Sequence, residues 1–308
     1  MRKTALNTIY ELAKLDDRIV FIGSDLGAGV LDQFKQEMPD RFFMEGISEA
    51  HVIGMAAGMA LEGRIVYINT IATFLTRRCF EQIVLDLCLH RANVRLIGSG
   101  GGVVYAPLGP THEAIEDIAI LRALPGMTVL APADAQEMRR LITATVDHQG
   151  PVYIRLGKGG EPVVTDPDQP FEVGRVYPLR EGADGLIVTT GVMAQMALGS
   201  SDLLAARGLK IGVLHVPSVK PMNSTQLLPF LEAVPLVLTL EEHTIMGGLG
   251  SSVAEILAES GLAKRFKRLG FPDVFPEKYG SQESLMAYYG LSSGLVAEAL
   301  IELATLIK

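Results

Sequence analysis

The residue most suited to take part in a reaction is Glu49, which lies in the segment RFFMEGISEAHVIGMAAGMALEGR from Arg41 to Arg64. Ser48 can cap the helix that follows, and Glu49 falls in its first turn, among glycines and alanines. Burial favours a protonated carboxyl, whereas the positive end of the helix dipole favours the carboxylate. Glu49 could therefore exchange a proton with a ligand, although an ordinary buried acid at a helix start has the same pattern.

Two further stretches carry candidate ligand contacts. ATFLTRRCFEQIVLDL contains Phe74 and Phe80, and GPTHEAIEDIAILRALPGMTVLAPAD contains His112. Aromatic residues usually belong to a core, and a lone histidine usually makes structural hydrogen bonds. The guanidinium groups of Arg2 and Arg155 suit an anion, although an exposed arginine is the default reading for each. Residue types alone leave these alternatives open.

The segments that must position these residues alternate between two types. Short β-branched runs bounded by Gly, Asp or Pro precede longer helical patterns, which is typical of parallel βαβ units. In the first half, strands are predicted at Ile19–Gly23, Ile65–Ile68, Val94–Ile97, Thr128–Ala131 and Val152–Arg155. Helices are predicted at Glu49–Leu61, Phe74–Leu89, Glu113–Leu124 and Ala135–His148, after an amphipathic N-terminal helix.

A smaller α/β domain follows an irregular stretch. GKGGEPVVTDPDQP has the composition of a linker, so we place one domain at 1–165, a linker at 166–184 and a second domain at 185–308. Strands are predicted there at Leu186–Thr190, Ile211–His215, Leu236–Glu241 and Arg265–Leu269, and helices at Met193–Ala206, Gly250–Ser260 and Ser293–Ile307. The fold class is therefore α/β, with two doubly wound domains.

Composition argues against several classes of protein. The net charge is −8 with no long basic run, so we expect no nucleic-acid partner. Cys79 and Cys88 fit neither a disulfide framework nor a zinc pair. No stretch approaches a membrane span and the N-terminus lacks the apolar core of a signal peptide, so we expect no membrane partner and a cytoplasmic location.

The segment GISEAHVIGMAAGMA resembles the stretch of thiamine-diphosphate enzymes of the transketolase type that carries their glutamate. The resemblance implies a pyrimidine-binding domain followed by a transketolase C-terminal domain. It implies that Glu49 hydrogen-bonds N1′ of the cofactor's aminopyrimidine and so promotes loss of the thiazolium C2 proton. It also assigns a cofactor contact to Asp25.

The same resemblance implies further roles. Phe74 and Phe80 match the aromatic platform for the pyrimidine, with Arg77 at a position that is often aromatic, and His112 in GPTH matches the histidine that contacts the donor ketose hydroxyl groups. Arg2 and Arg155 match arginines that grip the substrate phosphate. EEHTIMGGLGSSVAEILAE, from Glu241, resembles the family's C-terminal domain, and its glycines indicate a tight turn rather than a dinucleotide loop.

A diphosphate-binding half is missing from this sequence. Members of the family hold the diphosphate through Mg²⁺ with a GDG motif and a later asparagine, whose oxygens suit that cation, and GDG does not occur here. The resemblance therefore implies a split transketolase in which an N-terminal partner subunit carries GDG and ligates Mg²⁺. We expect an α2β2 heterotetramer that acts on sugar phosphates, and a subunit that is inactive alone.

Departures from the family pattern affect substrate recognition. Leu108 stands where an aspartate reads a sugar hydroxyl, Gly100 stands where a phosphate-binding histidine is common, and a serine is absent near Gly29. Because these polar contacts to the substrate are missing, recognition of an ordinary pentulose phosphate is in doubt. The donor could instead be a ketose with altered stereochemistry, a branch or a sulfonate tail. The alternatives are the β-subunit of a 2-oxo acid dehydrogenase, a 1-deoxyxylulose-5-phosphate synthase-like enzyme and a non-catalytic scaffold.

Overall fold

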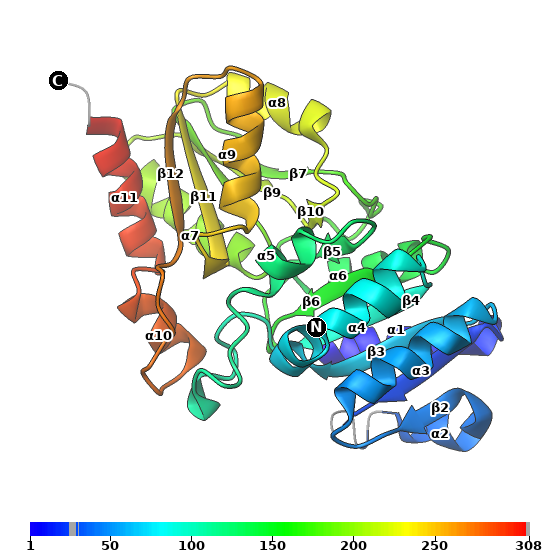
Figure 1. The fold of residues 1–308 in the computed structure, drawn as a ribbon. Helices are drawn as coiled ribbons and strands as arrows, with labels where there is room; N and C mark the ends of the chain where they lie inside the picture. Colours follow the sequence, from blue (N-terminus) through cyan, green and yellow to red (C-terminus); the bar gives the residue numbers. More distant parts are fainter. Residues whose placement is uncertain (25–28, 30, 306–308) are drawn as a thin grey trace.

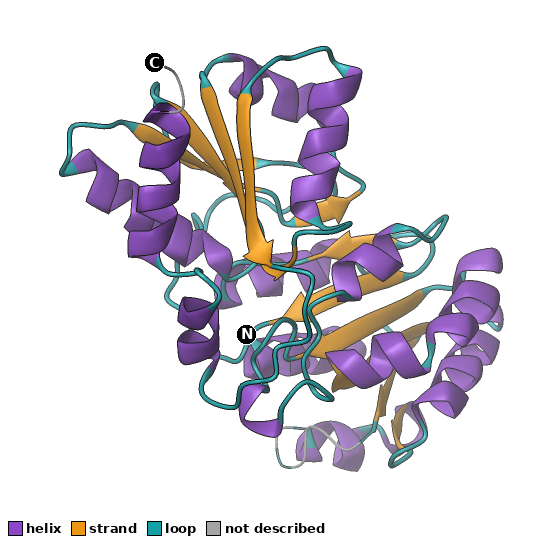
Figure 2. Cartoon of the chain, turned by 60° about the vertical axis from the view of Figure 1, so that its left-hand side comes forward, coloured by secondary structure: helices purple, strands orange, loops and turns teal. Residues whose placement is uncertain are grey.

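The computed structural model describes residues 1–24, 29 and 31–305, which form two layered α/β units (Figure 1). The first unit contains the N-terminus and is coloured blue to green, and the second runs from green to red and ends at the C-terminus. In each unit, helices lie on both faces of one sheet (Figure 2). The two α/β domains predicted from the sequence are confirmed. Asp25 lies outside the described residues.

The first sheet has seven strands in the order β10-β5-β6-β4-β3-β1-β2, and every neighbouring pair is parallel except β10 with β5. Most of its central strand positions are buried, as in parallel sheets that are covered on both faces. The strands are β1 (Ile19–Gly23), β2 (Phe42–Met44), β3 (Ile65–Ile71), β4 (Val94–Ser99), β5 (Thr128–Leu130), β6 (Val152–Leu156) and β10 (Ser218–Lys220).

Helices bury an apolar core on each face of this sheet. One face is covered by α3 (Glu49–Leu61), by the helical run η2 (Phe74–Arg78), α4 (Phe80–Gln82) and η3 (Ile83–Leu89), and by α5 (Asp117–Arg122). The other face is covered by α1 (Arg2–Leu15), α2 (Asp32–Glu37) and α6 (Ala135–Ala144). Two short 3₁₀ turns are η1 (Pro39–Arg41) and η4 (Ala106–Leu108).

The second sheet has five strands in the order β12-β11-β8-β9-β7, with only β7 antiparallel to its neighbour. They are β7 (Tyr177–Arg180), β8 (Gly185–Thr189), β9 (Ile211–His215), β11 (Leu236–Thr244) and β12 (Arg265–Phe271). One face is covered by α7 (Met193–Ala205), α10 (Gln282–Tyr288) and α11 (Ser293–Thr305), and the other by α8 (Ser224–Glu232) and α9 (Leu249–Glu259).

The structure corrects the predicted division of the chain in two places. The predicted linker 166–184 contains β7, which pairs with β9 and so belongs to the second sheet. Strand β10 comes from the second half of the chain but pairs with β5 of the first sheet. Both strands are short edge strands, where three or four residues give little periodic signal. The two units are therefore joined by hydrogen bonding as well as by the chain.

Two predicted helices differ from the prediction for identifiable reasons. The helix predicted from Glu113 begins only at Asp117, because the N–H and C=O of Ala114 both pair with Gly102 at 2.8 Å. The helix predicted at Phe74–Leu89 exists but contains two π-helical turns, η2 and η3. Such turns are rare, and they often occur at functional sites.

One described segment, Gln282–Thr305, is long and apolar enough to span a membrane by length and composition, contrary to the prediction from sequence. A turn divides it into α10 and α11. The apolar face of α11, including Val296, Leu300 and Leu303, is buried within the second unit. The apolar face of α11 thus packs in the core of the second unit, and 33% of the most apolar part of the segment is buried.

Candidate functional site

The predicted site residues gather at the carboxyl edge of the first sheet. Glu49 follows β2, Phe74 follows β3 and Gly100 follows β4 directly. Strands β1 and β3 are neighbours, and the helices that follow them, α2 and η2, cover opposite faces of the sheet, so the loops that leave these two strands diverge at this edge. Open α/β sheets bind ligands at such switch points. The topology thus places the chemistry-bearing residues where this fold class forms a site.

A chain of contacts links Glu49, Phe74 and His112. Glu49 is only 3% exposed, and its Oε2 accepts a hydrogen bond from Nη1 of Arg78 at 2.6 Å. The Arg78 guanidinium lies over the Phe74 ring, with its carbon 4.7 Å from the ring centroid. Phe74 meets the His112 ring edge-on, with 5.1 Å between centroids. The structure therefore brings three predicted site residues together and adds Arg78, which sequence reasoning missed.

The local geometry at the start of α3 differs from the prediction. The Ser48 side chain does not cap the helix, because its Oγ donates to the carbonyl of Glu45 at 2.6 Å. Glu49 is nevertheless the first residue of the helix, where the dipole favours a negative charge. Ser48 instead fixes the loop that delivers Glu49 to the sheet edge.

Phe80 and Arg77, on the same helical run as Phe74, have different surroundings. Phe80 is 36% exposed on α4, so its ring lies at the surface of this chain. Arg77 forms an ion pair with Glu116, and its Nη1 donates to the carbonyl of Pro110 at 3.2 Å. Arg77 therefore ties η2 to the loop that carries His112. A charged side chain at a position that is often aromatic thus positions the loop.

The geometry does not support the prediction that Arg155 grips a substrate phosphate. Arg155 is 7% exposed, and its Nε donates to Oδ2 of the fully buried Asp117 at 2.8 Å. Its Nη2 donates to the carbonyls of Ala114 at 2.9 Å and Glu242 at 2.8 Å. Glu242 belongs to the second unit, so Arg155 joins the two units rather than facing a ligand.

The other predicted substrate residues lie near the same edge. Gly100 is buried at φ +74°, and a Cβ there would meet the ring of Tyr105. Burial raises the pKa of Tyr105, whereas nearby Arg2, partly exposed at the start of α1, lowers it. Leu108 is 52% exposed in η4, and Gly29 is exposed. The Tyr105 ring thus covers the position where the family has a histidine.

Glu113, next to His112, was also missed by sequence reasoning. It is fully buried, and neither carboxyl oxygen has a hydrogen-bond partner among the residues that the structure describes. Burial raises the pKa of Glu113 to about 7, although the positive charge of Arg77 opposes the shift. A buried acid without a partner is uncommon, and no sequence pattern distinguishes it from an exposed glutamate in a loop.

The segment from Glu241 has a structural role. The Glu241 carboxylate accepts hydrogen bonds from the N–H groups of Leu249 and Gly250, both at 2.8 Å, at the start of α9. Glu242 accepts from the N–H of Val103 at 2.8 Å, which adds another bond between the two units. These contacts agree with a tight turn before a closely packed helix.

Thiamine diphosphate, the cofactor that the resemblance implies, carries an aminopyrimidine ring. An aminopyrimidine is a flat ring with N–H groups, so it needs a carboxyl partner at its edge and an apolar or aromatic surface against its face. Glu49 and Phe74 already hold a flat N–H donor in this way, namely the Arg78 guanidinium. In the described part of the chain, no three His, Cys, Asp or Glu side chains gather as metal ligands. The contacts of Glu49 and Phe74 are of the kind that the pyrimidine half of the cofactor needs.

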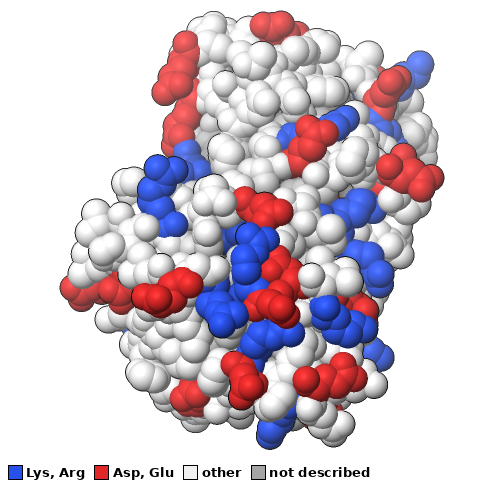
Figure 3. Space-filling view, turned by 90° about the vertical axis from the view of Figure 1, so that its right-hand side faces the viewer, with Lys and Arg blue, Asp and Glu red and all other residues white. Residues whose placement is uncertain are grey.

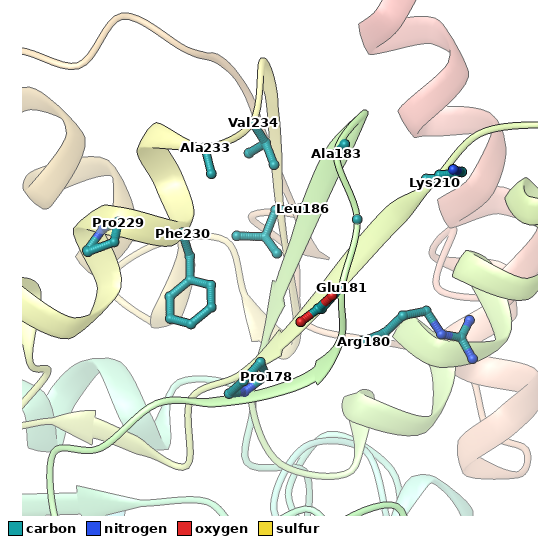
Figure 4. A pocket seen from close by; sticks show the side chains of 11 residues that line it. Pro178, Arg180, Glu181, Ala183, Leu186, Lys210, Pro229, Phe230, Ala233 and Val234 are labelled. Carbon is teal, nitrogen blue, oxygen red and sulfur yellow. The ribbon is translucent and has the colours of Figure 1, made fainter.

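Two surface hollows have linings that do not include Glu49, Phe74 or Arg78. One of about 560 Å³ lies in the second unit between β7 and α8. Phe230 and Leu186 line its apolar part, whereas Arg180 and Lys210 extend away from Phe230 (Figure 4). Another of about 370 Å³ borders Arg77 and Glu116. The face in Figure 3 mixes positive and negative side chains and shows no broad basic surface.

Comparison with known proteins defines the family. Residues 1–161 match the family model for the transketolase pyrimidine binding domain, and residues 174–295 match that for the transketolase C-terminal domain. A solved structure described as a split gene transketolase, inactive beta4 tetramer, is 36% identical, with a TM-score of 0.90 over 100% of this chain and 99% of that one.

Curated relatives include two transketolase subunits of about this length. A subunit of the apulose-4-phosphate transketolase of Phocaeicola vulgatus is 34% identical over 98% of this chain and 96% of its own. The 6-deoxy-6-sulfo-D-fructose transketolase subunit of a Clostridium species is 36% identical over 91% and 90%. The 1-deoxy-D-xylulose-5-phosphate synthase of a Synechococcus species is 37% identical over 96% of this chain but 46% of its own. The chain therefore belongs to the transketolase family and comprises its pyrimidine-binding and C-terminal domains, as in split transketolases.

Proposed function

We propose that this chain is the pyrimidine-binding subunit of a two-chain, thiamine diphosphate-dependent transketolase that moves a two-carbon ketol unit from a ketose to an aldose. The observation that supports this most is the buried Glu49 carboxylate, whose Oε2 holds a flat N–H donor against Phe74. The family depends on thiamine diphosphate, so we assign the aminopyrimidine of that cofactor to the site formed by Glu49 and Phe74.

When bound, the cofactor supplies the nucleophilic thiazolium carbon that breaks and remakes the carbon–carbon bond. The residues of this chain supply proton movement and orientation. Glu49, buried at the start of α3, holds the pyrimidine edge and passes a proton at Oε2, the oxygen that already accepts a hydrogen bond. Phe74 supports the ring face, and His112, which touches Phe74, orients the hydroxyl groups of the ketose.

A partner subunit completes the site. The sequence contains no GDG motif, so we assign the diphosphate and the Mg²⁺ ligands to an N-terminal subunit. We propose an α2β2 heterotetramer located in the cytoplasm. The similar split-gene structure is described as an inactive β4 tetramer, which supports the idea that a chain of this type needs its partner for activity.

The substrate is proposed to be a modified ketose, such as a branched or sulfonated sugar, or its phosphate. Leu108 is exposed near His112 where the family has an aspartate, and Tyr105 covers Gly100. Arg155 is committed to Asp117 and so is not available to an anionic tail. Relatives of this chain carry names that refer to apulose 4-phosphate and a sulfofructose. Equal turnover of xylulose 5-phosphate and every modified ketose tested would contradict this specificity.

The reaction is tested with the reconstituted pair. We expect Glu49→Ala to abolish ketol transfer, and Glu62→Ala, an exposed acid at the end of the same helix, to leave it unchanged. Parallel assays of 2-oxo acid oxidation and of deoxyxylulose phosphate synthesis separate the two enzyme alternatives. Unchanged ketol transfer by Glu49→Ala would exclude Glu49 as the activating group, and no turnover in any assay would favour a scaffold.

A further inference from the structure

The side chain of Arg78 contacts both Glu49 and Phe74, the two residues that form the proposed pyrimidine-binding site. Its Nη1 donates to Oε2 of Glu49 at 2.6 Å, and its guanidinium carbon stands 4.7 Å from the centroid of Phe74. A guanidinium is flat, carries N–H donors along its edge and stacks on aromatic faces. An aminopyrimidine shares these three properties, although it is larger.

The spacing of Phe74 and Arg78 along the helical run places the Arg78 side chain beside the Phe74 ring. In η2, Phe74 and Arg78 are four residues apart. Residues four apart stand on the same side of a helix, so their side chains can touch. The Arg78 side chain therefore lies on the Phe74 ring and extends from there to α3.

Burial explains why a partner is needed. Glu49 is 3% exposed, and a buried carboxylate without a hydrogen-bonding partner is strongly unfavourable. The Arg78 side chain is 46% exposed, so it can withdraw into solvent without leaving a cavity in the core. Arg77, by contrast, is held by Glu116 and Pro110 and cannot exchange partners freely.

We propose that Arg78 is a resident competitor of the cofactor: it occupies the place of the aminopyrimidine, satisfies Glu49 until the cofactor arrives, and must be displaced for the cofactor to bind. The proposal rests on the proposed function, because it takes Glu49 and Phe74 as the pyrimidine contacts. The arrangement keeps a buried acid paired when no pyrimidine contacts it and opposes cofactor binding.

The test measures direct binding of thiamine diphosphate, in the presence of Mg²⁺, to the assembled pair by titration calorimetry. Arg78→Met keeps the aliphatic stem and removes the competing charge. A half-exposed ion pair and a cation–π contact together correspond to about a 3- to 30-fold change in affinity. We therefore expect Arg78→Met to bind the cofactor about 3- to 30-fold more tightly than the wild-type chain.

Two further variants make the result specific. Arg78→Lys keeps the charge but loses the flat fork, so we expect a smaller gain in affinity. Arg139→Met is the matched control: Arg139 is exposed on α6, which packs on the opposite face of the sheet, and the affinity should not change. Thermal unfolding of each free chain checks that the variants are folded.

Each outcome is decisive. Weaker binding by Arg78→Met would mean that Arg78 holds the cofactor rather than competing with it, and an unchanged affinity would mean that the contact does not oppose binding. Either result overturns the inference while the proposed function stands, because the wild-type pair still binds. If neither pair binds thiamine diphosphate, both the inference and the proposed function fail.

Discussion

Arg155 is expected to act on stability rather than on substrate binding, and its replacement by methionine tests this difference. In the folded chain the guanidinium pairs with the buried Asp117 and bridges to the carbonyl of Glu242 in the second unit. Methionine fills similar space but removes the charged partner of the Asp117 carboxylate, which keeps the Tyr153 hydroxyl as a donor at 2.6 Å.

The size of the effect follows from the contacts that are lost. Removing one partner of a buried ion pair costs about 3–5 kcal/mol, because the remaining charge is uncompensated. Two buried carbonyls, those of Ala114 and Glu242, lose a charged donor at the same time. We therefore expect the free energy of unfolding to fall by at least about 3 kcal/mol. Asp117→Asn removes the partner charge, so the double variant should lose less than the sum of the single variants.

Urea denaturation of the isolated chain measures these changes. Arg139→Met, at an exposed site on α6, serves as the control and should stay within about 0.5 kcal/mol of the wild type. The reconstituted pair is then assayed at permissive temperature for its KM toward the ketose. An unchanged stability together with a raised KM would refute our reading and restore Arg155 as a phosphate ligand.

Two further predictions concern stability. Burial raises the pKa of Glu113 from 4.5 to about 7, so the folded chain should lose stability as pH rises from about 4.5 to 7. Glu113→Gln should remove that loss and raise stability at pH 8 by up to about 3 kcal/mol, with little change at pH 4; equal urea midpoints at pH 8 would contradict it. Gly100→Ala should cost about 1–3 kcal/mol more than Gly290→Ala, since both glycines have positive φ but only Gly100 faces a ring. Equal thermal shifts for the two alanine variants would refute the Tyr105 contact.

Much of the fold could be predicted because its central strands are buried on both faces. The predicted starts of β1, β3, β4, β5 and β6 agree with the structure, since continuous β-branched runs occur where helices cover both sides of a sheet. Helix α3 agrees at both ends, because its small residues and its polar flanks define it locally. The edge strands β2, β7 and β10 were missed, since pairing with distant segments stabilises them more than their own sequence does.

The site could be predicted in part for a similar reason. Glu49, Phe74 and His112 follow recognisable local motifs, and the sheet brings them together. The role of Arg155 depends on Asp117 and on the second unit, which lie far along the chain or across the domain boundary. Likewise, Arg78 contacts Glu49 from a separate helical segment, 29 positions along the chain, and no residue pattern indicates that contact. Sequence motifs identify single residues better than they identify partners.

The central claim is that Glu49 activates a cofactor whose other half is held by a partner subunit. Its most direct test is the rate at which the C2 proton of thiamine diphosphate exchanges with deuterium in the assembled pair, measured by quenched-flow NMR. Because a positioned acid or base contributes about 10²–10⁴-fold, Glu49→Gln should slow the exchange by at least about 100-fold while the pair still assembles. An exchange rate equal to that of the wild-type pair, with the cofactor bound to both, would contradict the account.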